Sequence, residues 1–192
     1  MPLGEHNWEN LIEDLFETIK YLKKKYDTQR IILCGHSFGS MLGMDFLQKY
    51  PNEVLGFIAY GVLVNTKKQD KISYDDLTIK VAKKGSFFDK MRFRKVDSAF
   101  PDVSQADYVK GVHLLSSLQM KFCYIRNPYL SILEKSPFFK TKDLHQIRRG
   151  QKYTDKLVGE VEYTYDITGA VDYQVPIFFL LGTRDDWAPS SV

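Results

Sequence analysis

The apolar positions near the start of the chain recur with helical spacing. Between Trp8 and Leu22, seven large apolar side chains fall at the i, i+3 and i+4 positions, and Asn7 precedes them as an N-cap. This spacing places the apolar side chains on one face of a helix. We therefore expect an amphipathic helix that runs from Trp8 to about Tyr26.

Three short apolar runs have the pattern of buried strands. The three runs are Arg30–Cys34, Val54–Tyr60 and Val175–Gly182. Between the first and the second run lies a segment with helical spacing that ends near Tyr50. Strands that are apolar on both sides belong in a parallel sheet whose two faces are covered by helices. The pattern therefore predicts the α/β class, with a parallel sheet of about three strands at its core.

Between the second and third runs the strand pattern is lost. Residues 62–170 mix aromatic and basic residues with short helical stretches, which we expect at Tyr74–Lys84, Gln105–Gln119, Tyr129–Glu134 and Lys142–Gly150. We interpret this region as a large helical cap or lid, in which most aromatic side chains pack between small helices. The predicted organisation is then core residues 1–61, cap residues 62–170 and core residues 171–192.

The segment between the first strand and the following helix reads G-x-S-x-G, from Gly35 to Gly39. A strand, a sharp turn carrying a serine and a helix form the context of a nucleophile elbow, although an ordinary glycine-rich turn is the alternative. Such a turn strains Ser37, and we expect both glycines to leave room where strand and helix converge. Ser37 Oγ would project from the strand end, and the backbone N–H of Phe38 would face a developing oxyanion. His36 should point away and pack.

A carboxylate follows the third strand, in the pattern Gly182-x-x-Asp185-x-x-x-Pro189. It lies just beyond the C-terminal end of a parallel strand, at the edge where open α/β sheets hold their sites. Asp186 competes for the role of the acid, and either side chain could be a solvated loop residue. We expect Asp185 to be the acid, since its spacing from Gly182 suits the order Ser…Asp…His along the chain.

Taken together, these features resemble the α/β-hydrolase superfamily, in which the acid commonly lies in a G-x-x-D-x-x-x-P pattern. More narrowly, the chain resembles the prolyl aminopeptidase (proline iminopeptidase) branch. The residues that carry this resemblance are Ser37–Ser40, Lys49–Val54, Gly61–Asn65, Ser73-Tyr74 and Ala82–Gly85. The resemblance implies an aminopeptidase-like serine hydrolase that cleaves an amide or ester through an acyl-enzyme. It also implies a small-molecule or short-peptide substrate, with an apolar or proline N-terminal residue.

The sequence departs from this family pattern in its histidines and in its first strands. All four histidines precede Asp185, whereas the base follows the acid in this fold: His6, His36, His113 and His145. The H-G-G type loop that supplies a second oxyanion N–H is also missing. We therefore expect a chain truncated at both ends, with bare sheet edges at 31–34 and 177–181 that allow self-association. The alternative is a non-catalytic binding protein or inactive fragment on a hydrolase scaffold.

Composition narrows the choice of partners. Lys and Arg number 27 against 24 Asp and Glu, a net charge of +3 that is too balanced to favour nucleic acid. Cys34 and Cys123 form no disulfide framework, and we expect Cys34 to be a small buried hydrophobe. The sequence has no metal-ligand spacing, phosphate-binding loop, signal peptide or membrane-length apolar run. We therefore expect a cytoplasmic protein with no metal, cofactor or membrane partner.

Overall fold

The structure is a computed structural model that describes residues 7–122, 135, 137, 140–169, 171–183, 185, 188 and 189. The chain divides into two compact units. We call them the sheet unit, formed by Met1–Gln69 and Thr164–Val192, and the helical unit, formed by Asp70–Tyr163. Each unit is described by itself.

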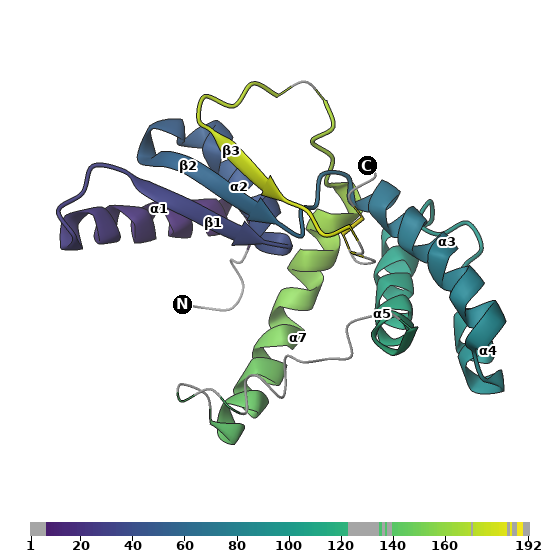
Figure 1. Ribbon diagram of the computed structural model, residues 1–192. Coiled ribbons are helices and arrows are strands. Elements are labelled where there is room, and N and C mark those ends of the chain that lie inside the picture. The colour runs from purple at the N-terminus through teal and green to yellow at the C-terminus, as the bar shows by residue number, and fades with distance from the viewer. Residues whose placement is uncertain are drawn as a thin grey trace. The chain divides into compact units, whose positions relative to one another are not determined.

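A parallel sheet of three strands forms the centre of the sheet unit in the described residues (Figure 1). The strand order is β1 (Ile31–His36), β2 (Val54–Tyr60), β3 (Ile177–Leu180). His36 pairs with Tyr60, and Tyr60 pairs with Leu180, so the last residues of the three strands lie side by side. This arrangement confirms the predicted α/β class and sets one C-terminal edge for the sheet.

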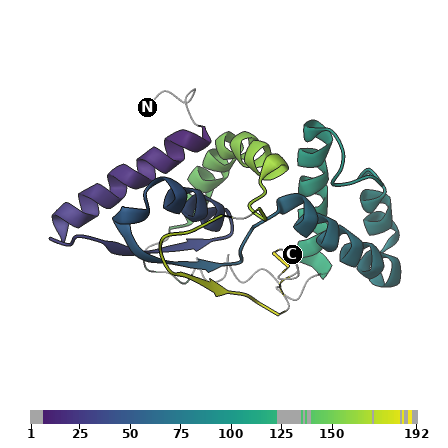
Figure 2. The same ribbon diagram turned by 90° about the horizontal axis from the view of Figure 1, so that it is seen from above.

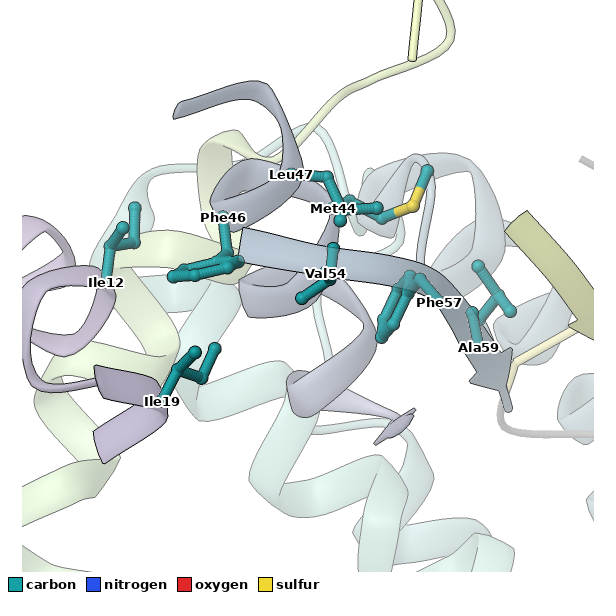
Figure 3. Packing of buried hydrophobic residues seen from close by; sticks show 9 residues of the cluster. Ile12, Ile19, Met44, Phe46, Leu47, Val54, Phe57 and Ala59 are labelled. Carbon is teal, nitrogen blue, oxygen red and sulfur yellow. The ribbon is translucent and has the colours of Figure 1, made fainter. Parts of the chain in front are cut away.

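Two helices cover one face of this sheet (Figures 1 and 2). α1 (Trp8–Lys25) begins at Asn7, whose side chain accepts the Asn10 N–H at 2.8 Å, and α2 (Phe38–Lys49) follows β1 directly. Figure 3 shows the cluster that they bury, which draws on both helices and on β2: Ile12, Ile19, Met44, Phe46, Leu47, Val54, Phe57 and Ala59. Burial of this cluster stabilises the unit, since removing apolar area from water is the main favourable contribution to folding.

The opposite face of the sheet is open in the part of the chain that the structure describes. Ile32 and Phe178 are 63% and 62% exposed, and Cys34 is exposed beside them. The expectations that helices cover both faces and that Cys34 is buried are therefore wrong for the described residues. The reason is that α1 and α2 both pack on the face that carries Leu33 and Phe57.

The helical unit contains no strand among its described residues, as the sequence predicts. Its helices are α3 (Thr66–Lys84), which starts in the sheet unit, α4 (Phe87–Phe93), α5 (Gln105–Phe122) and α7 (Thr141–Thr164). α3, α5 and α7 contain the predicted stretches 74–84, 105–119 and 142–150 and extend beyond them, and α4 was not predicted. The predicted stretch 129–134 lies outside the described residues. Across the described residues, the helices are too short or too polar to cross a membrane.

The connections between the units begin several residues inside the expected cap boundaries. Asn65 and Asp166 form an antiparallel bridge, and the Ile167 N–H donates to the Val64 carbonyl at 2.8 Å. The Thr66 N–H also donates to the Tyr165 carbonyl, at 3.3 Å. These contacts join the two connecting segments to each other within the sheet unit.

Two carboxyl groups lie close to one buried tyrosine inside the helical unit. The Tyr108 hydroxyl of α5 donates to Asp70 Oδ2 of α3 at 2.5 Å, and Tyr108 and Glu162 of α7 line the same small cavity. Burial raises the pKa of Asp70 to about 6. Burial, with a further contribution from the Asp70 charge, raises the pKa of Glu162 to about 7. The folded unit therefore retains protons that the unfolded chain has lost near neutral pH.

We expect the helical unit to lose stability as the pH rises from 5 to 8. A carboxyl group with a raised pKa does not destabilise the fold below its unfolded pKa, which is 3.8 for Asp70 and 4.5 for Glu162. The full destabilisation is reached above about pH 7, where both groups are ionised in the folded chain as well. The loss should be on the order of 3 kcal/mol. Urea unfolding at several pH values measures it, and Asp70→Asn with Glu162→Gln should flatten the profile. A stability that is flat or rises over this range in the unaltered chain would contradict the assignment.

Candidate active site

Ser37 occupies the turn between β1 and α2 in a strained backbone conformation. Its φ is 52° and its ψ is −119°, a combination that residues other than glycine rarely adopt. The Ser37 N–H donates to the Tyr60 carbonyl at 3.1 Å, which fixes the turn against the end of β2. Strain of this kind costs roughly 1–3 kcal/mol and persists only where surrounding contacts hold it.

Ser40 supplies a second set of contacts that hold the turn. Its backbone N–H and its Oγ both donate to the Ser37 carbonyl, at 2.7 and 2.6 Å. Ser40 Oγ also accepts the Leu63 N–H at 3.1 Å, and the side chain is fully buried. One hydroxyl therefore connects the serine turn to the segment after β2, and the motif alone gave no reason to single it out.

The two motif glycines have different roles. A Cβ on Gly35 would lie 2.3 Å from the Gly39 carbonyl oxygen and 2.9 Å from the Phe57 ring, so only glycine fits there. A Cβ on Gly39 would meet no atom within 4 Å in the described residues. The expectation of a required glycine is confirmed for Gly35 and wrong for Gly39, because the Gly39 backbone itself fills the space beside Gly35.

Phe38 is the first residue of α2, so its N–H has no acceptor within the helix. This N–H lies at the positive end of the helix dipole, next to Ser37. The Phe38 ring contacts the Trp8 ring edge-on, with centroids 5.3 Å apart. The position of the backbone donor is thereby tied to the packing of α1.

A polar network behind the turn holds Trp8 in place. Trp8 Nε1 donates to Asp45 Oδ2 at 2.7 Å, and the Tyr165 hydroxyl donates to Asp45 Oδ1 at 3.3 Å. The same hydroxyl lies 3.2 Å from the Met41 carbonyl. Burial raises the pKa of Asp45, and burial together with the Asp45 charge raises the pKa of Tyr165. Tyr165 therefore stays protonated and keeps both contacts at neutral pH.

Asp185 lies in the turn beyond β3. Its N–H donates to the Gly182 carbonyl at 3.3 Å, and its Oδ1 accepts the Ala188 N–H at 2.9 Å. Ser37 and Asp185 follow strands that flank β2, so their strands are separated by about 10 Å at one C-terminal edge. Asp186, the competing acid, lies outside the described residues.

The histidines are not brought to Ser37 in the described residues. His36 is exposed, and its one described ring contact is stacking on the Tyr60 ring, with centroids 4.6 Å apart. His113 is exposed on α5 in the helical unit, and nothing is described for His6 or for the side chain of His145. Among the described contacts, none joins a histidine to Ser37.

Comparison with protein families decides the broad classification. The family model for serine aminopeptidase S33 matches residues 3–119. The chain belongs to this family of α/β-hydrolases. The matched range of the S33 family includes Ser37 and Phe38, whereas Asp185 lies beyond it.

The similar proteins are longer than this chain. The probable aminopeptidase YbaC of Bacillus subtilis (strain 168) is 21% identical over 189 residues, which cover 95% of this chain and 58% of that protein. VinJ, known from a crystal structure, has 14% sequence identity to this chain and a TM-score of 0.48. The match covers 98% of this chain and 62% of VinJ. A marine microorganism esterase is 18% identical, with a TM-score of 0.46, and the match covers 97% and 62%. The chain therefore spans about three-fifths of the length of these proteins.

Proposed function

We propose that this chain carries the nucleophile and the acid of a serine hydrolase that cleaves an amide or ester through an acyl-enzyme. Ser37 Oγ would attack the carbonyl carbon while a histidine takes its proton. Asp185 would orient that histidine and stabilise its charged form, and the Phe38 N–H would donate to the oxyanion. The strained backbone of Ser37 between β1 and α2 is the observation that carries this proposal.

The proposed substrate is a short peptide with a free N-terminus and an apolar or proline first residue. The name of the matched family and that of the Bacillus relative both support an aminopeptidase. The resemblance of 37–40 and 49–54 to prolyl aminopeptidases favours the narrower choice. The reaction as proposed uses side chains and backbone donors alone.

The 192-residue polypeptide is expected to be slow by itself, because no histidine follows Asp185 in the sequence. Removing one member of a catalytic triad typically lowers the rate by several powers of ten and leaves a small residual activity. Added imidazole is a general base of the same chemistry as the missing side chain. It should therefore accelerate attack by Ser37 if it reaches the space between Ser37 and Asp185.

The test is hydrolysis of nitrophenyl acetate and of proline nitroanilide by the 192-residue polypeptide, with and without imidazole. We expect slow hydrolysis of the ester by the protein. Added imidazole should raise the rate by more than imidazole alone hydrolyses the ester in free solution, and the effect on the anilide should be smaller. Equal rates with protein and without it, at every imidazole concentration, would contradict the proposal. That result would favour the alternative function, a binding protein on a hydrolase scaffold. The position of all four histidines before Asp185 in the sequence also supports this alternative.

A further inference from the structure

Two phenylalanines on α4 are unusually exposed for large apolar side chains. Phe87 is 73% exposed and Phe88 is 72% exposed, and Met91 one turn further is 45% exposed. The two rings contact each other at 5.8 Å and cross at 78°. Adjacent exposed aromatic side chains commonly mark a surface that binds a partner.

Exposure of these side chains is not a consequence of a loose helix. Ser86 and Asp89 form a capping box at the start of α4, and Asp89 Oδ2 accepts a bond from Lys121 Nζ of α5 at 2.6 Å. Phe93 stacks on the Tyr74 ring of α3 at 5.2 Å. The inner side of α4 is therefore fixed to the helical unit, and Phe87 and Phe88 remain outside this packing.

Exposed basic residues flank the two phenylalanines in the sequence. The segment from residue 83 to residue 95 holds one acidic residue and six basic ones, which are all exposed: Lys83, Lys84, Lys90, Arg92, Arg94 and Lys95. None of the six has an acidic partner among the described residues. Lys121 and Ser86 lower the pKa of Asp89 to about 2, and its charge is already paired with Lys121. The segment thus carries more positive charge than the +3 of the whole chain.

We propose that the α4 segment, residues 83–95, binds the surface of an anionic phospholipid bilayer. The exposed side chains of Phe87, Phe88 and Met91 enter the boundary between headgroups and acyl chains. The six cations of the segment contact lipid phosphates and carboxylates. This binding is peripheral and does not depend on the proposed hydrolase chemistry. The sequence-based expectation of no membrane partner rested on the lack of a membrane-length apolar run, which has no bearing on surface binding.

The charges and the ring geometry favour a bilayer over other partners. A second copy of the same segment would bring six unpaired cations against six others, which is repulsive. Nucleic-acid bases stack on flat aromatic platforms, whereas Phe87 and Phe88 cross nearly at right angles. A bilayer interface accepts both the crossed rings and the cations.

The test is co-sedimentation of the 192-residue chain with vesicles of phosphatidylcholine alone or mixed with phosphatidylserine. We expect binding only to the mixed vesicles, weakened by salt. Phe87→Ser with Phe88→Ser should weaken binding about tenfold or more, because the inserted apolar area is lost. Tyr21→Ser, which removes an aromatic side chain of α1 that is 62% exposed, should leave binding unchanged.

A second variant reports on insertion directly. Phe88→Trp should show a blue shift in fluorescence with mixed vesicles beyond that of the unaltered chain, because its indole leaves water. Unchanged emission, no binding to mixed vesicles, or binding that survives loss of both phenylalanines would overturn the proposal. Tighter binding to a single-stranded oligonucleotide, or self-association that needs Phe87 and Phe88 without vesicle binding, would overturn it as well.

Discussion

Ser37→Ala is expected to reduce imidazole-supported ester hydrolysis to the rate of imidazole alone. The substitution removes the attacking oxygen and changes little else, since Ser37 Oγ makes no helix-capping hydrogen bond. Once the nucleophile is lost, no acyl-enzyme forms, so imidazole has no serine hydroxyl to activate in the site. Ser98→Ala, which alters an exposed serine in the helical unit, is the matched control and should retain full turnover.

Stability separates the strain of Ser37 from its chemistry. Ser37→Gly should be as inactive as Ser37→Ala but more stable by about 1–2 kcal/mol, because glycine adopts positive φ values without steric cost. Thermal or urea unfolding of the two variants measures this difference. Turnover that survives both substitutions would contradict the nucleophile, and equal stability of the two variants would contradict the strained backbone.

Gly35→Ala is expected to destabilise the sheet unit by about 3 kcal/mol or more, because its Cβ would overlap a backbone carbonyl that cannot move without shifting α2. Gly39→Ala is the matched variant from the same motif. It should be neutral or stabilising by up to about 1 kcal/mol, since its Cβ meets open space at the start of a helix. Urea unfolding of both variants tests the difference, and equal effects would show that the turn is packed otherwise.

Local patterns predicted those elements whose signals are contained in short stretches of sequence. The spacing from Trp8 to Leu22, with Asn7 as its cap, gave α1 almost to the residue. The apolar runs gave the three strands, and the G-x-S-x-G motif gave the position of the strained serine. These features depend on a few neighbouring residues, so sequence alone is sufficient for them.

Features that depend on contacts between distant segments were not predictable in this way. Which face α1 and α2 would cover was not encoded in β1, and Cys34 was misassigned for that reason. The network around Asp45 joins residues that lie 37 and 120 positions apart. Helix α4 is the exception, because the Ser86-x-x-Asp89 capping box was a local signal that could have revealed it.

The most direct test of Ser37 as the nucleophile is to map the site of covalent labelling. The 192-residue polypeptide is treated with a fluorophosphonate in the presence of imidazole, digested, and analysed by peptide mass spectrometry. A single label on the peptide that contains Ser37, absent from Ser37→Ala, is the result we predict. A label on another serine or tyrosine that persists in Ser37→Ala, or no label on a folded chain, would contradict it.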